Sequence, residues 1–121
     1  MPQAKPMIEA SVLELGDPER EAVAGRLQTA AKIAWEATRR RETRWVLEDL
    51  GRYRVAVRAK RKPGVPGFWL ELLVTSRFPL SRTEVEALAK LAGVKRPILD
   101  EFPGNQIFVE EASWSRYAAS A

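Results

Sequence analysis

The chain has 121 residues, 45% of them hydrophobic and 30% charged, and its formal net charge is +4. These values fit one globular domain and exclude general disorder, and no apolar run approaches the roughly 18 residues that cross a membrane. The chain has no cysteine and no histidine, which excludes disulfides, zinc–thiolate sites and every catalytic set built on a cysteine or histidine side chain.

Composition and the first residues also indicate where the protein works. The N-terminal sequence lacks the basic-then-apolar layout of a signal peptide, so we expect a cytoplasmic protein. Abundant Arg and Glu, with few Asn and Gln side chains, suggest a thermophilic source. We expect a single domain over residues 1–121, in which 1–6 and 115–121 form loose tails.

A strand and a long helix are expected first along the chain. Residues 7–15 alternate in polarity and predict a strand that ends at Gly16. Asp17 and Pro18 then predict a helix start, because the Asp17 carboxylate accepts from free N–H groups of the first turn and proline has no N–H there. Small and apolar residues recur at three- and four-residue spacing up to the arginine run at 39–41, which predicts a helix packed on a sheet.

An antiparallel meander of three strands is expected next, over residues 43–48, 52–60 and 68–75, with Gly51 supplying a positive φ in the first turn. Apolar residues of the middle strand face one side: Tyr53, Val55, Val57 and Ala59. Its basic residues face the other side: Arg52, Arg54, Arg58 and Lys60. One side of the third strand carries Trp69, Glu71, Leu73 and Thr75.

A second helix and a last strand complete the expected elements. Ser81 and Glu84 fit a capping box at the start of a helix, and Gly93 suits the position just after its end. Residues 95–105 contain two prolines and favour no single element. Residues 106–112 predict a strand.

The expected order is therefore β-α-β-β-β-α-β, which predicts an α+β protein with a mostly antiparallel sheet. Two helices packed on one face of that sheet form a two-layer sandwich related to the ferredoxin-like plan. If both helices cover the side that carries Tyr53 and Val55, the side that carries Arg54 and Arg58 stays open to solvent or to a partner.

Residues 84–102 also resemble a helix-turn-helix motif. The expected spacing of small, turn and apolar residues is matched by Ala89, Gly93, Val94 and Leu99. The resemblance implies that Lys95 and Arg96 approach DNA. Pro97 departs from the motif, since it falls early in the second helix. The competing interpretation is a capped helix that ends at Gly93 and is followed by a loop.

Nothing in the sequence predicts catalysis. There is no glycine-rich phosphate loop, and no Glu is followed two places later by the Lys of a metal-dependent nuclease. The adjacent Glu110 and Glu111 point to opposite faces of a strand and cannot share a metal. We therefore expect a protein that is not an enzyme and has no cofactor, no metal and no small-molecule substrate.

The excess positive charge lies in residues 39–62, which carry ten basic and three acidic side chains, whereas the remaining chain has a net charge of −3. Alternate side chains on one face of a strand lie roughly 6.5–7 Å apart, close to the spacing of phosphates along a nucleic-acid strand. Exposed aromatic rings beside them would stack on bases. The candidate nucleic-acid-binding residues are Arg44, Arg52, Arg54, Arg58, Lys60, Arg61, Lys62 and Trp69.

We therefore expect a nucleic-acid-binding protein for single-stranded DNA or RNA, with little sequence specificity and a basic strand face as its site. Two alternatives compete. The arginines of this face are neutralised by acids across the sheet, with Glu48, Glu71 and Glu110 or Glu111 as candidates. Otherwise, the same face builds a homo-oligomer or docks an acidic protein partner, since exposed apolar residues rimmed by charge mark interfaces.

Overall fold

A computed structural model describes residues 7–61 and 68–114 of the chain. The elements, in chain order, are η1 (Val12–Glu14), α1 (Asp17–Arg39), β1 (Val46–Asp49), β2 (Tyr53–Lys60), β3 (Phe68–Ser76), α2 (Arg82–Leu91), β4 (Ile98–Phe102) and β5 (Gln106–Trp114). The two expected tails, 1–6 and 115–121, lie outside the described residues, as does the candidate residue Lys62.

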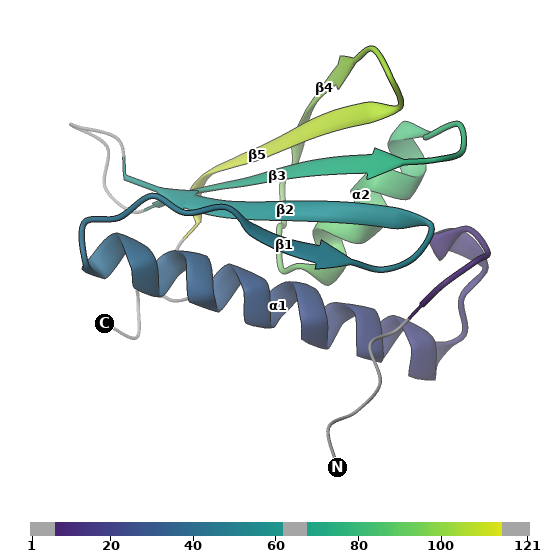
Figure 1. Cartoon of the computed structure of the whole chain (residues 1–121), viewed down its shortest axis with the longest axis horizontal. Helices are drawn as coiled ribbons and strands as arrows, with labels where there is room; N and C mark the ends of the chain where they lie inside the picture. The colour runs from purple at the N-terminus through teal and green to yellow at the C-terminus, as the bar shows by residue number, and fades with distance from the viewer. Residues whose placement is uncertain (1–6, 62–67, 115–121) are drawn as a thin grey trace.

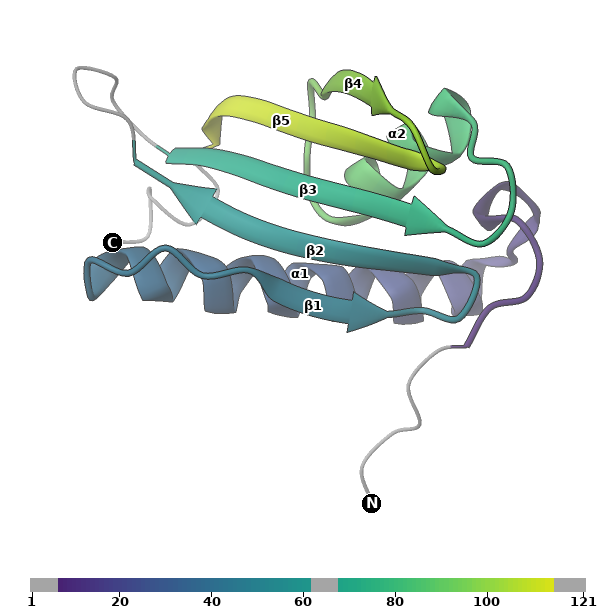
Figure 2. The ribbon, with the colours of Figure 1, turned by 45° about the horizontal axis from the view of Figure 1, so that its top comes forward.

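The five strands form one antiparallel sheet in the order β1-β2-β3-β5-β4. Figure 1 shows α1 running along the sheet beneath β1 and β2, and Figure 2 shows the sheet in front with both helices behind it. The prediction of an α+β two-layer arrangement is therefore confirmed. The face of the sheet turned away from the helices is called the open face below.

The core lies between the sheet and the helices. The alternation expected of residues 52–60 is confirmed in β2, whose apolar residues are fully buried: Tyr53, Val55, Val57 and Ala59. Facing them, α1 buries a stripe that is rich in alanine: Ala30, Ala31, Ala34 and Ala37. Because alanine side chains are short, this stripe lets the long helix lie close against the first two strands.

The expected strand over residues 7–15 is wrong. Only Ile8 pairs with the sheet, through an isolated parallel bridge to Gly51, and the chain then turns into η1. Ser11 caps η1 by accepting from the Leu13 N–H, a local hydrogen bond that competes with extended backbone. The buried residues are Ile8, Val12 and Leu15, spaced as on a turn and not at every second position.

The start of α1 also differs from the expected cap. Gly16 is the N-cap and makes no side-chain hydrogen bond, so Asp17 is the first helical residue. The carboxylates of Asp17 and Glu19 still lie in the first turn, where negative charge stabilises the positive end of the helix dipole. Pro18 needs no N–H partner at this position.

The region after α2 decides between the two interpretations of residues 84–102. The capping box of Ser81 and Glu84 is confirmed. At the other end Gly93, with a φ of 99°, donates to the Lys90 carbonyl, and Val94 donates to that of Ala89. The chain then forms β4 and no recognition helix, so the helix-turn-helix resemblance is wrong. The competing loop is also incomplete, since β4 adds an edge strand to the sheet.

Candidate nucleic-acid interface

Strand register defines which side chains share the open face. A central row of directly opposed residues crosses all five strands: Leu47, Ala56, Leu73, Phe108 and Asp100. Four of the five are apolar, and Leu47 is 64% exposed. The middle of the open face is therefore an apolar strip and not a track of positive charge.

Arg58 lies on one flank of this strip, and its guanidinium already contacts residues on neighbouring strands. Its Nε donates to Oε1 of Glu71 at 2.8 Å, and its Nη2 lies 2.7 Å from the same oxygen. Its guanidinium also stacks over the Trp45 ring, 4.3 Å from the centroid. Because Glu71 is itself buried, this pair is held firmly, and Arg58 has little freedom to turn towards a phosphate.

The other flank is weakly paired. Arg54 lies 3.8 Å from Asp49, and both side chains are largely exposed, so the pair adds little to stability. Glu48, which we expected to face the arginines, instead faces α1 and lies 3.4 Å from Arg26.

The open face as a whole is not positive among the described residues. Its bases are Arg54, Arg58 and Lys60. Its acids are Asp49, Glu71, Asp100 and Glu110. Charges on this face therefore nearly cancel, and a polyanion gains no net attraction from it.

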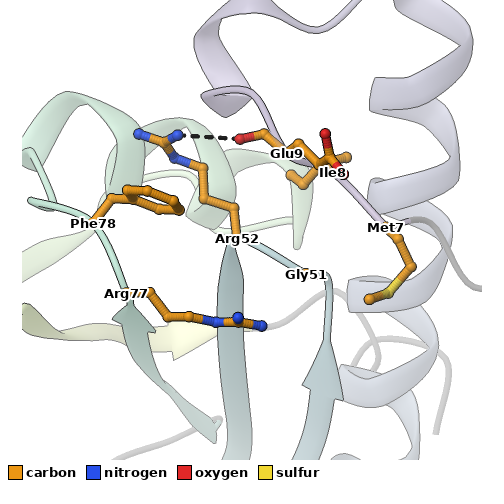
Figure 3. Close-up of a pocket in the computed structure, with 7 residues that line it drawn as sticks. All are labelled: Met7, Ile8, Glu9, Gly51, Arg52, Arg77 and Phe78. Carbon is orange, nitrogen blue, oxygen red and sulfur yellow. Dashed lines mark hydrogen bonds between the residues drawn. The ribbon is translucent and has the colours of Figure 1, made fainter.

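Arg52 lines a hollow of about 230 Å³ together with Arg54 and Arg77, and its guanidinium also has partners towards the helices. It precedes β2, where its Nη1 donates to the Glu9 carbonyl at 3.1 Å and its Nε lies 3.9 Å from Glu84. Figure 3 shows its side chain beside the Phe78 ring, and the guanidinium carbon lies 4.6 Å from the ring centroid. The Arg52 guanidinium therefore turns towards the start of α2, while Arg52 and Arg54 still line the same hollow.

A cavity of about 380 Å³ lies beside Arg52. It is lined by Met7, Ile8, Glu9, Gly51, Arg52, Arg77 and Phe78 (Figure 3). The contacts of Arg52 with the Glu9 carbonyl and with Phe78 hold the N-terminal segment against the sheet. We therefore interpret these contacts as structural.

A buried polar network lies behind Arg52. The hydroxyl of Tyr53 donates to the Glu84 carboxylate and accepts from the Val12 N–H at 3.1 Å. Burial alone would raise the pKa of Glu84, but hydrogen bonds from Tyr53 and Ser81 and the charge of Arg52 together lower it. Burial and the hydrogen bond to Glu84 raise the pKa of the Tyr53 hydroxyl. All members have partners inside the fold, so the network ties η1, β2 and α2 together.

A concentration of positive charge lies at the end of the molecule where α1 stops and β2 ends. A hollow of about 400 Å³ there is lined by Thr38, Arg39, Arg41, Glu42, Thr43 and Arg61. Lys60, the last residue of β2, precedes Arg61, and Arg44 follows Thr43. We call the group Arg39, Arg40, Arg41, Arg44, Lys60 and Arg61 the basic end. In the described part of the chain, segments 39–44 and 60–61 contain these six bases and one acid, Glu42, which lies 4.0 Å from Arg40.

Arg41 has an unusual backbone conformation at this end. Its φ is 60°, in the left-handed region that favours glycine. The Arg41 N–H donates to the Thr38 carbonyl and the Glu42 N–H to that of Ala37, both at 3.0 Å, which closes α1 with the motif that normally contains glycine. Arginine therefore occupies a position where glycine would adopt the positive φ at a lower conformational free energy. Arg41 is also one of the residues that line the hollow.

The structure thus divides the seven described candidate residues among different places. Arg44 and Arg61 belong to the basic end, and Lys60 lies where the open face meets that end. Arg54, Arg58 and Trp69 lie on the open face, and Arg52 lies at the opposite end of β2. From sequence, Arg39 and Arg41 were expected to stabilise the end of the helix dipole and to lie near the basic strand. Their convergence with Arg61 has no signal in local sequence, because about twenty residues separate the two segments.

No protein-family model, no curated protein and no solved structure matches this chain. Within residues 7–61 and 68–114, no group of three or more acidic side chains is arranged to hold a metal ion. The helices of that same part are too short or too polar to cross a membrane.

Proposed function

We propose that this protein binds nucleic acid through its basic end, mainly by contacts to phosphates. The observation that carries the proposal is the hollow lined by Arg39, Arg41 and Arg61 together with Thr38 and Thr43. Guanidinium groups hold phosphate oxygens through paired hydrogen bonds, and hydroxyl groups add further contacts. Among the described residues that line the hollow, the one acid is Glu42, which lies 4.0 Å from Arg40.

Single-stranded DNA or RNA fits this end best. Trp45 directly follows Arg44, is 41% exposed and already stacks with a guanidinium, so its indole is an aromatic surface beside the phosphate contacts. Arginines on a helix end and a strand end contact backbone and do not read base edges. Binding is therefore expected to be tolerant of sequence and strongly dependent on salt.

Arg41→Gly is the most informative variant. Glycine accepts a φ of 60° without strain, so the helix end is kept or stabilised while one positive charge is lost. We expect oligonucleotide affinity to fall, and the log–log slope of affinity against salt to become shallower by about 0.7. Fluorescence anisotropy with a labelled single strand at several salt concentrations measures both quantities.

Arg54→Gly is the matched control, because it removes the same charge from the open face, where the Arg54 side chain is 63% exposed. Its unfolding is followed separately, since glycine weakens a strand. At equal folded concentration we expect an unchanged salt slope. Equal loss in both variants, or no salt-dependent binding by the wild-type chain, contradicts the proposed site.

A further inference from the structure

The open face carries several large apolar side chains that are exposed to solvent. Four large apolar side chains on or beside it are at least 41% exposed: Trp45, Leu47, Ile98 and Phe102. Ala56, Leu73 and Phe108 connect them across the middle of the sheet. Monomeric proteins rarely expose a connected apolar patch of this kind, so it marks a surface that another molecule covers.

The charges on the open face are distributed unevenly between its two sides. Its bases lie on β2, whereas Asp100 and Glu110 lie on β4 and β5. Glu110 lies directly opposite Glu71, which already accepts from Arg58. Among the described residues Glu110 has no ion pair, and an acid facing another acid destabilises a sheet. Glu110 therefore has no cationic partner among the described residues of its own sheet.

We propose that a second copy of this chain covers the open face, forming a homodimer about a two-fold axis parallel to β3. Such an axis exchanges the two sides of the sheet. It places β2 of one subunit against β5 of the other, and β1 against β4, while residues of one row stay in that row.

This arrangement brings complementary residues of β2 and β5 together. In the central row, Leu73 meets Leu73 of the second copy, and the small Ala56 meets the large Phe108. In the next row, Arg58, which already pairs with Glu71 of its own sheet, lies against Glu110 of the second copy. The same operation places Leu47 against Asp100 and Glu71 against Glu71, so the complementarity is that of β2 against β5.

The area available is adequate for a dimer. Five strands spaced about 4.8 Å apart, over about seven residues of strand length, give a projected face of roughly 600 Å² per subunit. Side-chain relief increases the accessible area above this projection. A stable interface of standard size buries about 800 Å² per partner. Two twisted sheets also pack face to face with their strands within about 30° of each other, as an axis along β3 requires.

Dimerisation has a consequence for the basic end. Since the axis runs along the strands, both basic ends lie at the same end of the dimer, where they form one larger cationic surface. Only this consequence rests on the proposed function. The dimer itself is argued from the open face alone, and its test uses no nucleic acid.

The first experiment is the mass of the full-length chain by sedimentation, at protein concentrations up to about 100 μM. We expect a dimer for the wild-type chain. Ala56→Lys, which places a charge in the middle of the proposed interface, is expected to raise the dimer dissociation constant roughly 100-fold. Ile33→Lys on the exposed side of α1 is the control, and we expect it to remain dimeric. A monomeric wild-type chain, or a dimer that tolerates Ala56→Lys, overturns the proposal.

The second experiment tests the pairing itself by mixing two variants. Arg58→Glu places acid against acid across the interface, and Glu110→Arg places base against base, so each alone is expected to dissociate. Mixed together they regain both opposite-charge contacts and are expected to form a heterodimer. If Arg58→Glu fails to fold, Glu110→Arg is mixed with the wild-type chain instead. We then expect the Glu110→Arg variant to associate with itself more weakly than the wild type does. A mixture that stays monomeric overturns the two-fold arrangement.

Discussion

Glu84 joins three elements through one carboxylate. It belongs to the capping box of α2, accepts from the Tyr53 hydroxyl and lies 3.9 Å from Arg52. The hydrogen bonds and the positive charge hold its pKa below the ordinary value of 4.5 in spite of its burial. A carboxyl group with a lowered pKa in the folded state stabilises the fold only while it is ionised.

Acid is therefore expected to weaken the fold through Glu84. Its contribution to the free energy of unfolding is complete above pH 4.5 and is lost as the pH falls through the lower pKa of the folded state. Glu84→Gln, which keeps a capping side chain, is expected to flatten this acid dependence. Urea unfolding between pH 3 and pH 7 measures it. A variant as acid-sensitive as the wild type contradicts this role of Glu84.

Tyr53→Phe tests the same network from its other side. It removes one donor from the Glu84 carboxylate and leaves the buried Val12 N–H without its partner. A lost partner of this kind costs about 1–3 kcal/mol of stability. Thermal unfolding at pH 7 is the measurement, and a change within about 0.5 kcal/mol contradicts a structural role for this hydroxyl.

At the scale of elements, the N-terminal segment is attached to the sheet by close backbone contact. The Ile8 N–H donates to the Leu50 carbonyl, and the Arg52 N–H donates to that of Ile8, both at 2.9 Å. Gly51 lies between them with a φ of 88°, and a Cβ there would lie 2.8 Å from the Ile8 oxygen. Only glycine fits both the backbone conformation and the contact.

Gly51→Ala is expected to destabilise the protein by about 1–3 kcal/mol, with residues 7–15 released first. Gly25→Ala is its matched control, since a Cβ at Gly25 in α1 meets nothing within 4 Å. Alanine there is expected to stabilise the helix by about 0.5–1 kcal/mol. Urea unfolding compares the two, and hydrogen exchange locates the release. Equal effects of the two substitutions would contradict the proposed contact.

The elements that could be predicted from sequence are those with a local physical signal. The alternation of β2 and the capping box of α2 depend on neighbouring residues, and both are confirmed. Residues 7–15 misled because a short run of alternating polarity does not distinguish a strand from turns anchored by Ser11. β4 was missed because it is an edge strand of five residues whose pairing with β5 depends on the whole sheet.

At the scale of the whole molecule, the net charge of each surface depends on the order of the strands in the sheet. It could therefore not be predicted from sequence. Segment 39–62 is basic as a stretch of chain, yet folding distributes it among the basic end, the open face and the Arg52 corner. The acids of the open face come from β1, β3, β4 and β5. Acids on the other strands therefore neutralise the basic residues of β2 on the open face, and the basic end stays positive.

The most direct test of the account is to map where a single-stranded oligonucleotide contacts the protein, by following backbone amide signals in an NMR titration at low salt. We predict that the perturbed amides cluster at residues 38–44 and 60–61, and that the signals return to their free positions when salt is added. Perturbation centred on Ala56, Leu73 and Phe108, with the basic end unchanged, would contradict the account.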